Sequence, residues 1–110
     1  MGFDPTRYGP FFRYASSSVI GSPGAPWQIV PPSPYRVGII FGVTGTNITI
    51  NPVVAPSGSI GIVLSPGNSP MRFMMSESGP LCQQLWWGGP VTGSIYVVEI
   101  LYQPGVSGEF

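Results

Sequence analysis

The sequence predicts an all-β fold: an antiparallel β-sandwich, jelly-roll-like, that follows an extended proline-rich N-terminal arm. β-branched and aromatic residues dominate a series of short apolar runs, and turn signals separate these runs at intervals of about ten residues, as in sandwiches and barrels. The 16 glycines and 14 prolines interrupt every window long enough for a helix, so we expect no helix longer than one turn. A length of 110 residues suits one domain with one core.

The N-terminal arm is predicted over residues 1–34, a stretch that is rich in both proline and aromatic residues. Proline favours extended backbone, large rings act as anchors, and a solvated linker would be poor in aromatics. We therefore expect the arm to lie along a surface, that of its own domain or of a neighbouring subunit. Its candidate contact residues are Tyr8, Phe11, Phe12, Tyr14 and Trp27.

The sandwich domain is predicted over residues 35–110, with six strands bounded by turn residues. The first strand ends at Gly42, the second alternates apolar and polar residues until Pro52, and the third follows a turn at Gly58. The fourth is closed by Pro80 and the fifth by Gly88, while the sixth is the strongest apolar run. Short connections favour antiparallel neighbours. The six strands span residues 35–41, 46–50, 59–64, 71–75, 81–87 and 94–102.

The sixth strand is apolar on both faces, because both the odd-numbered and the even-numbered residues within 94–102 are mostly aliphatic or aromatic. Either the strand is central with both sides covered, or the face that carries Tyr96 and Tyr102 meets a partner. Glu99 interrupts the other face, and an unpaired buried carboxylate is costly. We expect a structural ion pair between Glu99 and an arginine, with Arg36 or Arg72 as the candidates.

Catalysis is not expected from this composition. The chain has no His and no Lys, and its four arginines and four acidic residues are scattered. Histidine is the usual general acid or base at neutral pH, and metal sites need clustered His, Cys or carboxylate ligands. Four cations and zero net charge leave no basic patch for a row of phosphates. We therefore expect no enzymatic activity, no cofactor, no metal site and no nucleic-acid partner.

Membrane and redox roles are also not expected. No apolar run reaches the roughly 18 residues of a membrane-spanning helix, and the N-terminus lacks the basic and apolar regions of a signal peptide. The single Cys82 flanks Leu81 in an apolar run, which is typical of a buried free thiol.

Trp86 and Trp87 are the one candidate ligand platform in the chain. Exposed tryptophans stack on sugar rings, but adjacent residues of a strand point to opposite faces, so the two rings cannot share one flat platform. We expect one of them to fill the core and the other to lie at a rim or an interface. Both are candidate partner-contact residues.

Residues 85–99 resemble the C-terminal part of small structural virion proteins of tailed bacteriophages. In these, a Leu-Trp pair, a small-residue turn and an apolar strand ending in Val-Glu close a β-sandwich, as in Leu85-Trp86 and Val98-Glu99 here. Residues 36–41 and 48–52 resemble the early strands of such proteins. The resemblance implies a capsid cement or decoration protein, often a homotrimer, that clamps neighbouring capsid subunits.

The predicted function is thus a non-enzymatic structural virion protein, made in the host cytoplasm, that bridges copies of the major capsid protein on the capsid surface. A rigid β core, a nearly uncharged adhesive surface and an extended arm suit that role, and many weak lattice contacts add up through avidity. The alternatives are another phage structural component, such as a head–tail or tail-fibre protein, and a carbohydrate-binding β-sandwich that uses Trp86 or Trp87.

Overall fold

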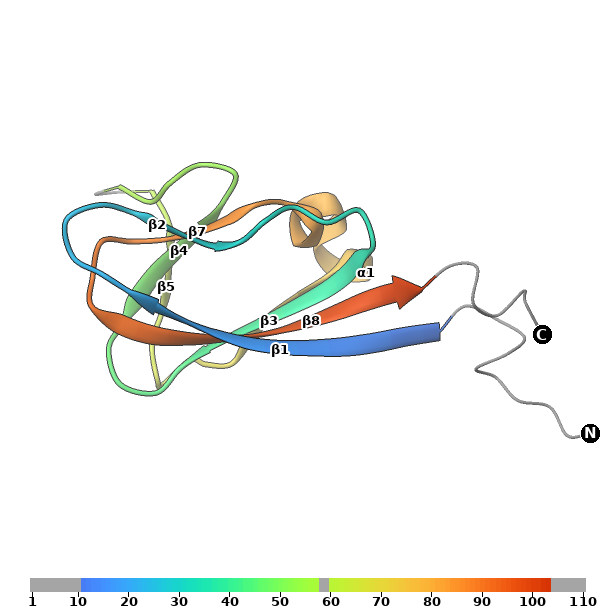
Figure 1. Cartoon of the computed structure of the whole chain (residues 1–110), viewed down its shortest axis with the longest axis horizontal. Helices are drawn as coiled ribbons and strands as arrows, with labels where there is room; N and C mark the ends of the chain where they lie inside the picture. Colours follow the sequence, from blue (N-terminus) through green and yellow to red (C-terminus); the bar gives the residue numbers. More distant parts are fainter. Residues whose placement is uncertain (1–10, 58–59, 104–110) are drawn as a thin grey trace, which may run out of the picture.

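Two four-stranded antiparallel sheets packed face to face form the fold in a computed structural model that describes residues 11–57 and 60–103 (Figure 1). The all-β sandwich prediction is confirmed. The strands are β1 (Phe11–Gly21), β2 (Trp27–Val30), β3 (Arg36–Val43), β4 (Ile48–Pro52), β5 (Ile62–Leu64), β6 (Met71–Met74), β7 (Trp86–Gly88) and β8 (Gly93–Gln103). Two short helical segments, α1 (Met75–Ser78) and η1 (Gly79–Gln83), connect β6 to β7. Within the described residues, no helix is long and apolar enough to cross a membrane.

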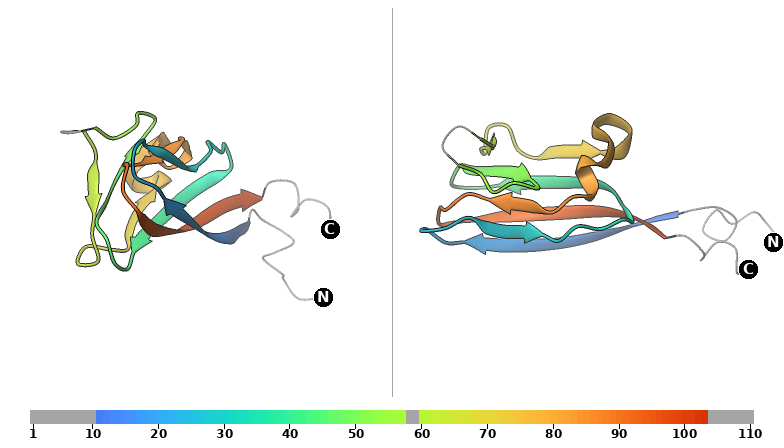
Figure 2. Two further views of the ribbon diagram at one scale, coloured as in Figure 1. Left: turned by 60° about the vertical axis from the view of Figure 1, so that its left-hand side comes forward. Right: turned by 90° about the horizontal axis from the view of Figure 1, so that it is seen from above.

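The strands pair in a nested order. The first sheet has the order β1-β8-β3-β6 and the second sheet has the order β2-β7-β4-β5. The first strand therefore pairs with the last, the second with the seventh, the third with the sixth, and the fourth with the fifth. Two further pairings, β3 with β8 and β4 with β7, close each sheet. The first half of the chain, β1 to β4, thus runs antiparallel to the second half, β5 to β8, and the paired halves fold into two layers (Figure 2).

The core lies between the two sheets and is built by alternation along the strands. The first sheet contributes Ile39 and Phe41 of β3 and Val97 of β8, all with no exposed surface. From the second sheet, Trp86 is equally buried, and its ring centroid lies 4.9 Å from that of Phe41 and 4.9 Å from that of Phe73. Burial of each large apolar side chain stabilises the fold by about 1.5–3 kcal/mol.

The structure differs from the predicted arm over residues 11–34. β1 pairs with β8 at all of its positions, and β2 pairs with β7, so this segment belongs to both sheets and the boundary at residue 34 separates no two units. The prolines of this stretch had predicted an extended arm, but none of them lies inside β1 or β2. Those at 23, 26, 31, 32 and 34 lie in the connections between strands. The prolines thus mark the loops of the sandwich. Residues 1–10, with Tyr8, lie outside the described part.

The fifth predicted strand is also different, because residues 79–83 form η1 and only residues 86–88 form β7. Pro80 sits at the start of η1, where a fixed φ and a missing N–H are tolerated. The third predicted strand is shorter than expected, with β5 confined to Ile62–Leu64. The other predicted strands correspond to β3, β4, β6 and β8 with end shifts of a few residues.

Candidate functional site

The outer face of the first sheet is the side that points away from the second sheet. In the β1–β8 pairing, Phe12 lies opposite Tyr102 and Tyr14 opposite Ile100. Directly opposite residues in an antiparallel pair point to the same face, so the register defines the whole surface. Its large apolar members are Phe12, Tyr14, Ile20, Ile40, Met74, Tyr96, Val98, Ile100 and Tyr102.

Four large apolar side chains of this outer face are exposed to solvent. The exposed fraction is 78% for Ile20, 70% for Tyr14, 53% for Phe12 and 36% for Tyr96. Arg72 is the one charged residue on this face among the described residues, and it pairs with Glu77 of α1 at 3.2 Å. An exposed apolar face with so little charge is typical of a surface that binds another protein.

Part of this face lies on a two-stranded ribbon. Figure 1 shows β1 and β8 continuing past the other strands of the sandwich. The β3 ladder on β8 starts at the pair Arg36–Leu101, and beyond it Tyr102 N–H donates to the Tyr35 carbonyl at 2.7 Å. Near the tip, Phe12 and Tyr102 pack with ring centroids 6.1 Å apart and a 55° interplanar angle. The aromatic pair therefore extends the outer face along the ribbon.

Two glycines of β3 keep the face flat. The Tyr96 ring occupies the space that a Cβ at Gly42 would fill, and the Met74 thioether does the same at Gly38. The Tyr96 and Met74 side chains therefore lie flat over the β3 backbone, and neither stands out from the face. Such flat, adaptable apolar groups suit protein contacts.

The structure separates the predicted contact residues. Phe12 and Tyr14 lie on the outer face, whereas the Phe11 side chain and Tyr8 lie outside the described residues. Trp86 is fully buried, with Nε1 donating to the Leu81 carbonyl at 3.2 Å, so it offers no contact surface.

The other two tryptophans are half-buried in the second sheet. Trp27 packs against Gly21 and Gly88, and Trp87 stands opposite Gln28 and Asn51 on the side away from the core. The sequence analysis did not single out Ile20. If β1 had been predicted as a strand, the even numbers of Phe12, Tyr14 and Ile20 would have placed the three side chains on one face.

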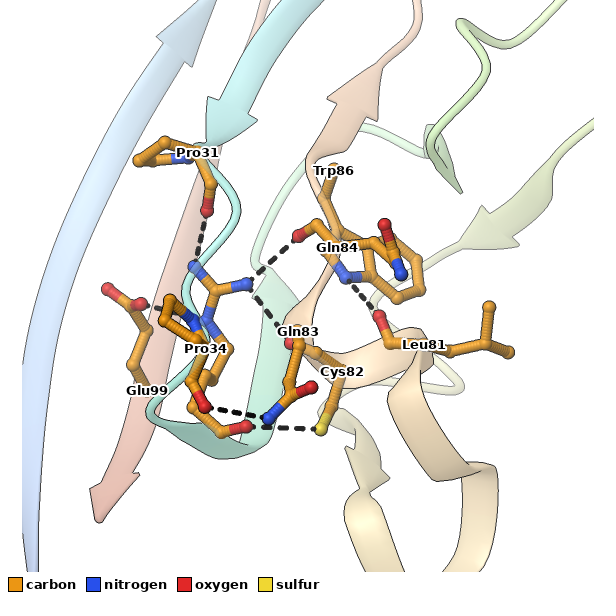
Figure 3. Close-up of polar contacts among 9 residues, drawn as sticks. Pro31, Pro34, Leu81, Cys82, Gln83, Gln84, Trp86 and Glu99 are labelled. Carbon is orange, nitrogen blue, oxygen red and sulfur yellow. Dashed lines mark hydrogen bonds and ion pairs between the residues drawn. The ribbon is translucent and has the colours of Figure 1, made fainter. Parts of the chain in front are cut away.

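Arg36 and Glu99 are brought together in the core. Arg36 has no exposed surface, and its Nε donates to Glu99 Oε2 at 2.9 Å. The rest of the guanidinium donates to three backbone carbonyls: those of Cys82 and Gln84 at 3.0 Å each, and that of Pro31 at 2.6 Å (Figure 3). One side chain thereby ties the β2–β3 connection, the η1–β7 segment and β8 together.

The chemistry available in this part of the molecule is limited. Within residues 11–57 and 60–103, no three His, Cys, Asp or Glu side chains gather as metal ligands would. Cys82 is buried, and desolvation raises the pKa of its thiol while nearby Arg36 partly opposes this. A raised pKa keeps the sulfur as a thiol, which is the less nucleophilic form.

The second sheet carries a groove of about 510 Å³ next to the β4 and β7 ends. It is lined by three prolines together with the polar side chains of Asn47, Thr49 and Ser57, and none of the residues that line it is aromatic. Trp87 is therefore not part of this groove, and the two features do not combine into a sugar-stacking site.

No family model, curated protein or solved structure matches this chain. Function is therefore inferred from the surface and the fold. The outer face of the first sheet is the candidate functional site, because it brings four exposed large apolar side chains onto one sheet face that carries a single described charged residue, Arg72.

Proposed function

We propose that the chain is a non-enzymatic structural subunit of a virion, a capsid cement or decoration protein that binds neighbouring capsid proteins. The observation that carries the proposal is the exposed, nearly uncharged outer face of the first sheet, led by Tyr14, Phe12 and Ile20. An isolated soluble domain gains nothing from such a face, whereas a subunit that covers it in an assembly buries that apolar area.

The nested strand order supports the virion class. Sheets with the orders β1-β8-β3-β6 and β2-β7-β4-β5 fit a jelly roll, the double-sheet architecture of many viral capsid and lectin domains. A fold alone does not give a function. Combined with the resemblance of residues 85–99 to phage virion proteins, however, the order favours a place on a capsid.

The partner that fits this face is an apolar patch of protein. Net charge is zero, and Arg72 on the face already pairs with Glu77, so neither a phosphate backbone nor an acidic surface finds a complementary charge. Weak apolar contacts repeated over a symmetric lattice sum through avidity. A homo-oligomer, with a trimer as the state that the resemblance implies, would multiply those contacts further.

A head–tail or tail-fibre component is the closest alternative, and it differs in copy number. A decoration protein occurs in a number that follows the capsid lattice, whereas a connector or fibre occurs in far fewer copies. A carbohydrate-binding module is the second alternative. Its support is limited to the amide and hydroxyl side chains of the groove in the second sheet, because no aromatic residue lines that groove.

The test is quantitative mass spectrometry of purified virus particles whose genome encodes the chain. We expect a copy number that follows the capsid lattice. The variant Phe12→Ser should reduce incorporation, because it removes an exposed ring of the outer face, while Val63→Ser on the second sheet, which has the same exposed fraction of 53%, should leave it unchanged. Absence of the chain from particles, or equal incorporation of both variants, contradicts the proposal.

A further inference from the structure

We propose that two copies of this chain pair through the free edge of β1 and form a two-fold dimer in which the two first sheets become one continuous sheet. The inference goes beyond the proposed function: it places a second copy at the β1 edge, which borders the outer face, and it replaces the trimer that the resemblance implies with a two-fold dimer. It is carried by the exposed edge of β1 and by the arrangement of the side chains along it.

The free edge of β1 is long and regular. β1 is the end strand of the first sheet, and no strand in the described part of the chain pairs with its other side. Its 11 residues span roughly 35 Å at the usual rise of a strand, and its pairing with β8 runs without a register shift. Backbone N–H and C=O groups of alternate residues therefore point outward along its length, where another strand can accept and donate hydrogen bonds.

Most of the devices that normally protect an edge are missing from β1. Proteins block edge strands with proline, charged side chains, bulges or short length; β1 has no proline, no lysine and no bulge, and Arg13 near its start is its one charged residue. The other three edge strands that the structure describes, β2, β5 and β6, have four, three and four residues. Since only β1 offers a partner of equal length, the fitting partner strand on a second copy is β1 itself, in the isologous arrangement of a two-fold dimer.

The side chains of β1 are self-complementary about its centre. Ser16, Ser17 and Ser18 occupy the middle of the strand, so small side chains meet where the two-fold axis would pass. If the axis passes at Ser16, antiparallel pairing places Ile20 of one copy opposite Phe12 of the other. If it passes at Ser17, Ile20 lies opposite Tyr14. In either register, the most exposed aliphatic side chain of the described chain meets an aromatic ring.

Charge does not oppose the pairing. Arg13 is the one charged residue of β1, and the two registers place it opposite Val19 or Gly21 of the other copy. The two arginines are then six or eight residues apart along the paired strands, beyond a Debye length in physiological salt. Pairing also joins the two outer faces into one apolar surface across the dimer.

The first experiment is sedimentation velocity on the purified full chain at about 100 μM, a concentration at which micromolar affinity gives mostly dimer. We expect a dimer. Ile20→Lys should weaken it by about tenfold or more in either register, and Tyr14→Lys should do so in the register with its axis at Ser17, because a charge then replaces an apolar contact at two symmetric places. Val63→Lys, the same kind of change on the short edge strand β5, should not. Circular dichroism confirms that all three variants are folded.

The second experiment is oxidative cross-linking of Ser16→Cys and Ser17→Cys, with Ser76→Cys on α1 as the matched exposed control. Opposed residues of an antiparallel pair lie within the Cα separation that a disulfide requires, and the native Cys82 is buried and gives little background. We expect a covalent dimer from the variant on the two-fold axis, which also identifies the register.

A monomer or a trimer for the unmodified chain would overturn the dimer, as would a dimer that Ile20→Lys leaves unchanged or cross-linking no better than that of the control. Both experiments use purified protein without particles. Failure here therefore removes the β1 pairing alone, whereas failure of incorporation into particles removes the virion role.

Discussion

Arg36 Nε donates to the Glu99 carboxylate at 2.9 Å between β3 and β8. The pair lies at the base of the projecting β1–β8 ribbon, because Arg36 stands opposite Leu101, near the end of the β3–β8 ladder. The three carbonyls that the same guanidinium binds belong to loops and η1. One buried cation therefore fixes the ribbon, and with it the outer face, to the rest of the sandwich.

Replacement of Arg36 by Met should destabilise the protein severely. The variant leaves the Glu99 carboxylate without its cation and three backbone carbonyls without their donor, and removal of one partner of a buried pair costs about 3–5 kcal/mol. Chemical denaturation monitored by tryptophan fluorescence measures the loss. Arg72→Met is the control, because its exposed pair with Glu77 should contribute about 0–1 kcal/mol. Equal losses for the two variants would contradict the structural role of Arg36.

Gly88→Ala should also lower the free energy of unfolding. The Trp27 indole packs so closely over Gly88 that a Cβ there would lie 2.7 Å from its ring, and overpacking of this kind costs about 1–3 kcal/mol. Gly45→Ala is the matched control, because nothing lies within 4 Å of its Cβ position. A thermal melt of both variants checks this. An unchanged melting temperature for Gly88→Ala would contradict the close packing of Trp27 on Gly88.

Cys82 should resist thiol reagents in the folded protein. Burial raises the pKa of the thiol above its ordinary value, so the folded state holds its proton more tightly than the unfolded chain does. Stability from this group is complete below the ordinary cysteine pKa and is lost as the pH rises through the raised value. We expect slow labelling by a disulfide reagent at pH 8 that becomes fast in denaturant, and Cys82→Ala should reduce the alkaline loss of stability. Rapid labelling of the native protein would contradict this.

The strands that the sequence predicted well are those whose pattern is local. β3 and β8 are continuous apolar runs, and β4 alternates until a proline stops it, so their residues alone define them. β1 was missed because Ser16–Ser18 break its apolar alternation and because its neighbouring prolines suggest an arm. Its strand character depends on β8, which lies far away in the sequence.

In the candidate site, too, the features that depend on distant residues could not be predicted from local sequence patterns. The sequence left Arg36 and Arg72 open as partners of Glu99, since the choice depends on the register between β3 and β8, which no local pattern contains. Likewise, η1 replaces a predicted strand where the carbonyls of Cys82 and Gln84 turn toward Arg36. The exposed aromatic residues of β1 were singled out for their type, but only the register shows that they share one face with Tyr96 and Tyr102.

The most direct test of the virion proposal is hydroxyl-radical footprinting of the chain, free and bound to particles. We expect Tyr14 and Tyr96 on the outer face to be oxidised in the free protein and protected in the particle. Leu81, which is exposed on η1 outside this face, should be oxidised in both. Protection of Leu81 with unchanged oxidation of Tyr14 and Tyr96 would contradict the assignment of the outer face as the binding surface.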